Sequence, residues 1–185
     1  MPWIDVIDEK DATGELKELY EKIKKTRGKV GNIIKIHSLN TRAMDAHVEF
    51  YMAIMFGKAE LSREEREIIA VTVSAANKCD YCINHHAEAL NYYWKDDQKI
   101  QLFIEGSDSL ELPKRHRLII NYAQKLTNSP QDNNQEDITK LKQFGFSDRE
   151  ILDITLITGY FNFINRVALG LGVEYSAEEV AGYNF

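Results

Sequence analysis

The stretch SREEREIIAVTVSAANKCDYCINHH, residues 62–86, decides the fold of this chain. It opens with a capping box, in which Ser62 at a helix N-cap is followed three residues later by Glu65. The apolar residues that come next recur with helical spacing. The stretch therefore predicts a helix that begins at Ser62 and continues to about Ala76.

A turn and a second helix follow directly. The polar run Asn77-Lys78-Cys79-Asp80 is typical of the end of one helix and the start of another. We expect the next helix to run from Cys79 to about Tyr93. The two helices then form an antiparallel hairpin.

Helical periodicity also dominates the rest of the chain, and no convincing run of strand-like alternation appears. Only 3 prolines and 10 glycines interrupt its 185 residues. We predict further helices at residues 14–26, 41–57, 99–105, 113–126, 136–144 and 148–169, a connecting segment at 31–40, a loop at 128–135 and a short C-terminal tail. The expected fold class is all-α, with residues 1–185 in a single domain.

A weak internal repeat accompanies this pattern. Sliding the sequence by 83 residues aligns residues 67–72 with residues 150–155. The same shift puts Asn162 and Asn165 opposite the two cysteines. We interpret these asparagines as packing positions, with the lining of a pocket or of an oligomer interface as the alternative. His37, His47 and His116 have no partner pattern, so we interpret them as ordinary surface or core histidines.

The charge pattern argues against a nucleic-acid partner. Lys and Arg number 23 against 29 Asp and Glu, a formal net charge of −6, and no basic stripe of the kind that nucleic-acid binding requires is visible.

The first residues lack the features of a signal peptide, and every apolar stretch is shorter than the roughly 20 residues that span a bilayer. We expect a cytoplasmic protein, where a structural disulfide is unusual, so its two cysteines need another explanation.

Cys79 and Cys82 are spaced for redox chemistry. Residues three apart on a helix are neighbours, so the two thiols can close a disulfide. His86 follows Cys82 by four residues, and its imidazole can accept a thiol proton or stabilise a thiolate. The start of a helix at Cys79 also favours a thiolate. This spacing leaves open which cysteine reacts first.

Glu67 joins these residues if the hairpin forms. The turn near Asn77 lies ten residues after Glu67 and nine before His86, so antiparallel pairing brings the two side chains level. A buried carboxylate that holds one ring nitrogen of His86 sets its tautomer and raises its basicity. The residues therefore predict a relay from Glu67 through His86 to Cys82.

The combination of Glu67, Cys79-Asp80-Tyr81-Cys82 and His86 resembles the active-site signature of the alkylhydroperoxidase D-like proteins, in the carboxymuconolactone decarboxylase superfamily. Residues 31–33, 61–77 and 161–166 look like the subgroup called peroxidase-related proteins. The resemblance covers about residues 14 to 175.

This resemblance implies an all-α, alkylhydroperoxidase D-like helical bundle that forms a homo-oligomer, a trimer or a hexamer. It implies reduction of a hydroperoxide by a dithiol, with a thiol or a disulfide reductase as electron donor and with no cofactor and no metal. Cys82 would be the thiolate that His86 and Glu67 activate, and Cys79 its disulfide partner. One departure is Tyr81, because the best-known members carry a histidine there. It bears on the efficiency of the peroxidase.

Other interpretations of the same residues remain open. Cys79, Cys82 and His86 supply three of the four ligands of a zinc site, with His85 or Glu67 as the fourth, although adjacent histidines on a regular helix do not easily point at one ion. A buried, inert cysteine pair is another alternative, which the polar residues around the cysteines argue against, because they predict a dithiol that is not deeply buried.

Two further functions remain as alternatives. The decarboxylase branch of the superfamily acts on ring lactones and does not depend on a cysteine pair, so the dithiol argues against it. A non-enzymatic redox sensor is oxidised once after each time that a reductant has reduced it, whereas an enzyme consumes peroxide continuously.

Overall fold

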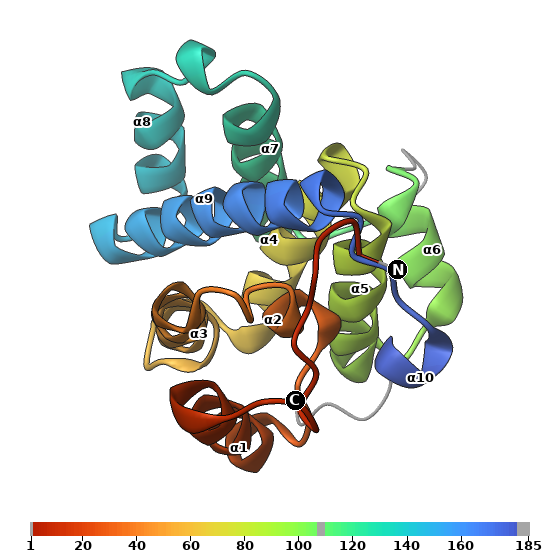
Figure 1. The fold of residues 1–185 in the computed structure, drawn as a ribbon. Coiled ribbons are helices and arrows are strands. Elements are labelled where there is room, and N and C mark those ends of the chain that lie inside the picture. Colours follow the sequence, from red (N-terminus) through yellow and green to blue (C-terminus); the bar gives the residue numbers. More distant parts are fainter. Residues whose placement is uncertain (1, 107–109, 181–185) are drawn as a thin grey trace.

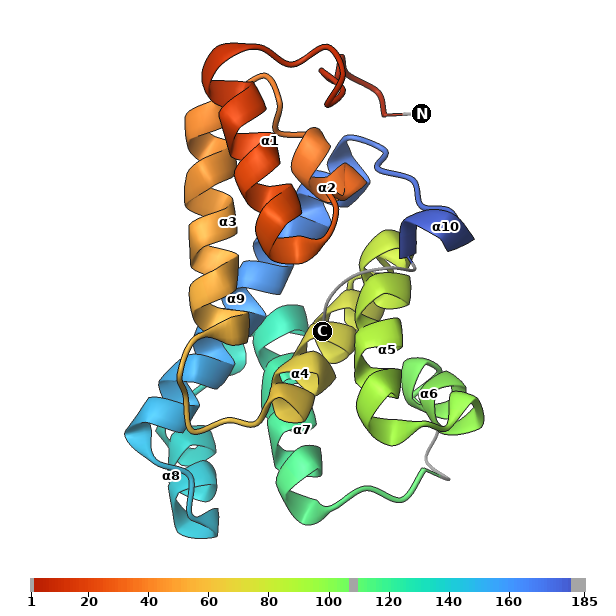
Figure 2. The same cartoon turned by 90° about the horizontal axis from the view of Figure 1, so that it is seen from below.

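Helix α4 (Arg63–Ala76) runs through the middle of the protein and packs against α5 (Asp80–Trp94), α7 (Lys114–Asn128) and α9 (Asp148–Gly170). The computed structural model describes residues 2–106 and 110–180. Every residue of α4 from Glu65 to Ser74 is buried, so this helix needs neighbours on all sides. Figure 2 shows it between α5 on one side and α7 and α9 on the other.

The described residues form ten α-helices and no strand, so the predicted all-α fold is confirmed. In Figure 1, α1, α2 and α3 lie below α9, and α7 and α8 lie above it. None of the helices in the described ranges combines the length and the apolar character needed to cross a membrane. The remaining elements are α1 (Gly14–Arg27), α2 (Asn32–Lys35), α3 (Thr41–Phe56), α6 (Asp97–Ile104), α8 (Gln135–Phe144), α10 (Ala177–Val180) and a 3-10 turn at Pro130–Asp132.

The structure adds short elements to three segments that the sequence left irregular. Helix α2 lies in the predicted connecting segment, the 3-10 turn lies in the predicted loop, and α10 lies in the predicted tail. Each is three or four residues long, too short for helical periodicity to be visible in the sequence.

Two capping boxes start α4 and α9. Ser62 Oγ accepts a hydrogen bond from the Glu65 backbone N–H at 3.1 Å, and Ser147 Oγ does the same for Glu150 at 3.0 Å. Arg115 on α7 binds both glutamates, with its Nε 2.5 Å from Glu65 Oε1 and its Nη2 on Glu150 Oε1. The starts of α4 and α9 are therefore joined through one guanidinium. The two boxes are 85 residues apart, two more than the shift that aligns the apolar residues of the repeat.

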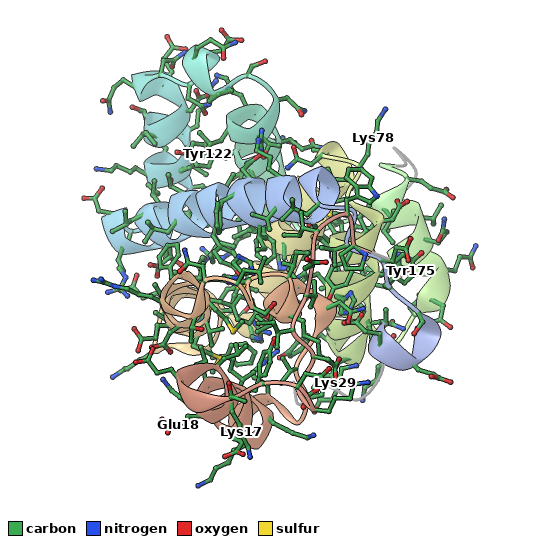
Figure 3. The ribbon with its side chains drawn as sticks, in the orientation of Figure 1. Lys17, Glu18, Lys29, Lys78, Tyr122 and Tyr175 are labelled. Carbon is green, nitrogen blue, oxygen red and sulfur yellow. The ribbon has the colours of Figure 1, made fainter. Side chains whose placement is uncertain are left out.

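The turn between α4 and α5 forms the predicted hairpin. Lys78 adopts a left-handed conformation, with φ of 56°, and the Cys79 backbone N–H donates to the Ser74 carbonyl at 3.0 Å. This pattern ends a helix by reversing the chain. Figure 3 shows the Lys78 side chain projecting outward from the turn, which leaves the following cysteine facing the interior.

The caps generate a test of helix stability. Substitution Ser62→Ala removes the hydrogen bond to the Glu65 N–H and should lower the free energy of unfolding by about 1 kcal/mol in chemical denaturation. Thr13→Ala is the matched control, because Thr13 occupies the N-cap of α1 without a side-chain cap hydrogen bond. Equal losses in the two variants would contradict a stabilising role for the α4 cap.

Candidate active site

The α4–α5 hairpin brings Glu67 and His86 into contact. The carboxylate of Glu67 has no solvent exposure, and its Oε2 lies 2.7 Å from Nδ1 of His86. Its other oxygen, Oε1, lies 2.5 Å from Nη2 of Arg63, one turn earlier on α4. Because a carboxylate accepts hydrogen bonds, this contact assigns the proton to Nδ1 of His86 and leaves Nε2 as the proton-accepting nitrogen.

The two cysteines lie at the start of α5 with their Sγ atoms 2.8 Å apart. Cys79 is 1% exposed and Cys82 is 4% exposed, so the prediction of a dithiol that is not deeply buried was wrong. The physical reason is the direction of the first turn of α5. Its polar residue Asp80 faces solvent, whereas the cysteines pack against Ala168 of α9.

Cys79 is the better thiolate of the pair. A hydrogen bond from the Cys82 thiol lowers the pKa of the Cys79 thiol, and the Cys82 backbone N–H adds to this effect against the opposing effect of burial. The hydrogen bond to Cys79, together with burial, raises the pKa of the Cys82 thiol. The first proton of the dithiol therefore leaves from Cys79, the residue that occupies the N-cap of α5.

A cluster of hydrogen-bonded asparagines contacts Cys82. The Asn165 side chain hydrogen-bonds the Cys82 thiol and works against the rise of its pKa. Asn165 is fully buried, donates to Ser74 Oγ at 3.2 Å and accepts from Asn77 Nδ2 at 3.0 Å. Asn77 also donates to Asn162 Oδ1 at 3.1 Å. Asn165 is therefore a buried, hydrogen-bonded residue, as the packing interpretation expects, and it also contacts the dithiol.

Cys82, Glu67 and His86 all line one cavity of about 90 Å³. Its walls are mostly apolar and come from α1, α3 and α9 as well as from the hairpin. The His86 ring packs edge-on against the Phe161 ring, with the ring centres 4.6 Å apart. Cys79 lines a different hollow of about 480 Å³, beside Tyr175, which Figure 3 labels.

Tyr81 lines both hollows. Its hydroxyl donates to Glu179 Oε1 at 2.8 Å and accepts from the Ile33 backbone N–H at 3.1 Å. His85 Nε2 lies 2.5 Å from the other oxygen of Glu179. Burial acts to raise the pKa of Glu179, but the hydrogen bonds from His85, the Asn32 backbone and Tyr81 hold it below its usual value. Glu179 of α10 is thereby tied to Tyr81 and His85, two residues that line the cavity.

A second polar pair stands in the cavity wall. His47 Nε2 lies 2.6 Å from the Tyr160 hydroxyl, and both residues line the cavity. Burial lowers the pKa of His47 to about 3, so its ring is neutral at physiological pH. The sequence indicated only an ordinary histidine, because its partner is 113 residues away.

The histidines of the candidate site face carboxylates rather than a common centre. His85 turns toward Glu179, and His86 turns toward Glu67. Within residues 2–106 and 110–180, no group of three His, Cys, Asp or Glu side chains is arranged to hold a metal ion.

Comparison with known proteins adds the following similarities. The profile of the Carboxymuconolactone decarboxylase family matches residues 41–111. A peroxidase-related protein from Silicibacter sp. TM1040 is 32% identical, with a TM-score of 0.83 over 97% of this chain and 92% of its own. A peroxidase-related protein from Ralstonia eutropha JMP134, described as an alkylhydroperoxidase AhpD core, is 25% identical, with a TM-score of 0.86 over 97% of this chain and 94% of its own.

Sestrin-3 of Mus musculus is 26% identical over 80% of this chain. The match spans only 30% of the length of sestrin-3.

The thiol pKa values generate a second test. Cys82→Ala removes the hydrogen-bond donor that lowers the pKa of Cys79, so that pKa should rise, whereas Cys82→Ser keeps a donor and should keep it lower. The ultraviolet absorbance of the thiolate, followed against pH, measures both values. Identical titrations of the two variants would show that Cys82 does not stabilise the Cys79 thiolate.

Proposed function

Because this chain belongs to the carboxymuconolactone decarboxylase family, in its alkylhydroperoxidase D-like, peroxidase-related group, we propose that it reduces hydroperoxides with the dithiol of Cys79 and Cys82. One observation carries this proposal. Cys82 shares a cavity with the Glu67–His86 pair, and the sulfur of Cys79 lies 2.8 Å from the sulfur of Cys82. A thiol and a proton acceptor thus share one cavity, and a second thiol lies in contact with the first.

In the first step a hydroperoxide enters the cavity and meets Cys82. The hydrogen bond between the two sulfurs favours the thiolate on Cys79, but only Cys82 lines the cavity, so Nε2 of His86 accepts the Cys82 proton as the peroxide binds. Glu67 stabilises the imidazolium that results. The Cys82 thiolate attacks the outer oxygen, the O–O bond breaks, and Cys82 becomes a sulfenic acid. His86 returns the proton to the departing alkoxide, which leaves as an alcohol.

In the second step Cys79 resolves the sulfenic acid. Cys79 gives up its proton, and its sulfur attacks the Cys82 sulfur, which lies 2.8 Å away in the reduced dithiol, to form the disulfide. The hydroxide that leaves takes up a proton and becomes water. The dithiol thus loses two electrons to the hydroperoxide.

Turnover requires an external donor of two electrons. We propose a thiol or a disulfide reductase, which returns the disulfide to the dithiol by thiol–disulfide exchange. We also propose that residues 1–185 form one domain and that the active form is a homo-oligomer, a trimer or a hexamer, as the family resemblance implies.

The roles of the two cysteines are tested by trapping the oxidised species. The wild type, treated with a hydroperoxide, should lose both free thiols and form a Cys79–Cys82 disulfide detectable by mass spectrometry. Cys79→Ser should accumulate a sulfenic acid on Cys82, which a dimedone adduct captures. Cys82→Ser should react far more slowly, because Cys79 does not line the cavity.

The opposite pattern would reverse the assignment of the two sulfurs. Thiols that stay untouched by peroxide, together with zinc that co-purifies in equimolar amount, would remove the redox proposal. A disulfide that forms once and is not recycled by any thiol donor would instead indicate a redox sensor.

The proton relay generates a separate test. His86→Ala removes the proton acceptor, so the pKa of the attacking thiol, read from the pH dependence of the peroxide reaction, should rise, and the rate at neutral pH should fall by about 10²-fold or more. Glu67→Gln keeps the shape of the buried side chain and should move the same pH profile in the same direction. An unchanged profile in His86→Ala would exclude His86 from the reaction.

A further inference from the structure

His47 on α3 and Tyr160 on α9 form a polar pair in a wall of the cavity that is otherwise mostly apolar. Neither residue takes part in the relay from Glu67 through His86 to Cys82. Helix α3 lies below α9 in Figure 1, and the two helices are in contact. The pair therefore brings polar groups to the cavity from two segments that are far apart in the sequence.

Aromatic contacts hold the Tyr160 ring in place. Its centre lies 5.8 Å from that of Phe50, 5.6 Å from that of Tyr51 and 5.2 Å from that of Phe161. The residue is only 6% exposed. Because closely packed side chains have little room to move, the hydroxyl is held at a fixed point of the cavity wall.

The hydrogen bond between the two side chains has a preferred direction. Burial lowers the pKa of His47 to about 3, so its ring is neutral and carries one hydrogen. Nδ1 of His47 is buried and has no hydrogen-bond partner among the described residues. A buried N–H without an acceptor is rarer than an acceptor without a donor, so the hydrogen belongs on Nε2. Nε2 then donates to the Tyr160 oxygen at 2.6 Å.

This direction leaves the hydrogen of the Tyr160 hydroxyl for a ligand. A hydroxyl has one hydrogen and two lone pairs, and His47 occupies one of the lone pairs. Across residues 2–106 and 110–180, His47 is the only hydrogen-bond partner of this hydroxyl. Burial raises the pKa of Tyr160 well above its usual value, and negative charge at Cys82 adds to the rise, so the hydroxyl keeps its hydrogen beside a Cys82 thiolate.

We propose that the Tyr160 hydroxyl donates a hydrogen bond to the alkyl-bearing oxygen of the hydroperoxide, and that His47 positions this hydroxyl. This inference rests on the proposed function and adds a residue to its first step. As the Cys82 sulfur attacks the outer oxygen and the O–O bond breaks, negative charge develops on the alkyl-bearing oxygen. A donor that is already in place stabilises this charge in the transition state. Tyr160 keeps its hydrogen throughout, and His86 still supplies the proton that completes the alcohol.

The test compares two peroxides whose leaving groups differ in basicity, tert-butyl hydroperoxide and peracetic acid. tert-Butoxide concentrates its charge on one oxygen, whereas acetate spreads its charge over two and needs less stabilisation. Tyr160→Phe keeps the ring and removes the hydroxyl. In this variant the second-order rate constant of thiol oxidation should fall about 10²-fold for tert-butyl hydroperoxide and far less for peracetic acid, so that the ratio of the two constants falls about tenfold or more. The ratio does not depend on the fraction of the variant that is folded.

The positioning role of His47 is tested by loss and rescue. His47→Leu removes the partner of the hydroxyl and should lower the same ratio. His47→Gln, whose amide can donate in place of Nε2, should restore part of it. Because the two residues act as a unit, Tyr160→Phe combined with His47→Leu should lower the ratio no further than Tyr160→Phe alone.

Tyr122→Phe is the matched control. It also removes one hydrogen-bonded hydroxyl, since the Tyr122 hydroxyl lies 3.1 Å from Thr155 Oγ1. Tyr122, labelled in Figure 3, does not line the cavity, so both rate constants should keep their wild-type values.

A wild-type ratio in Tyr160→Phe would overturn the inference and leave the peroxidase proposal standing. A fall by the same factor with both peroxides gives that ratio too, and it would show an effect on the thiol rather than on the leaving oxygen. A wild-type protein whose thiols react with neither peroxide would instead remove the peroxidase proposal together with the inference.

Discussion

The carboxylate of Glu67 has no contact with solvent, and much of the site depends on how this charge is compensated. A buried charge is costly unless it is paired and hydrogen-bonded. Arg63 pairs with it from the same helix and His86 from the facing one, so the contact with His86 sets the register of the α4–α5 hairpin. That register also orients Cys82, four residues before His86, toward the cavity. One buried charge thus links the packing of two helices to the chemistry that they present.

The two cysteines differ because of where the hairpin turns. Cys79 is the N-cap of α5 and receives hydrogen bonds from Cys82, so it holds the first thiolate. Cys82 lies one turn into the helix, where it meets the cavity and Asn165 of α9. A spacing of three residues therefore yields two distinct sulfurs, one at the start of the helix with the lower thiol pKa and one that faces the cavity.

The surroundings of the dithiol come from segments far outside the hairpin. Helices α1 and α3 and the end of α9 provide the aromatic walls, and Arg27 adds a positive charge. Helix α10 brings Glu179 to the hydroxyl of Tyr81, which lies between the two cysteines in the sequence. The hairpin thus supplies the dithiol, Glu67 and His86, whereas the other helices complete the walls of the cavity beside them.

The sequence by itself determined the helices, the hairpin and the proximity of Glu67 to His86, because capping boxes, helical periodicity and turn residues act over short distances. It did not determine the burial of the cysteines, the contact of Asn165 with Cys82, or the pairing of Tyr81 with Glu179, 98 residues away. Local periodicity identifies the apolar face of a helix but not the distant segment that covers it. Only the tertiary structure decided which side chains enclose the dithiol, because that enclosure depends on packing between helices that are remote in sequence.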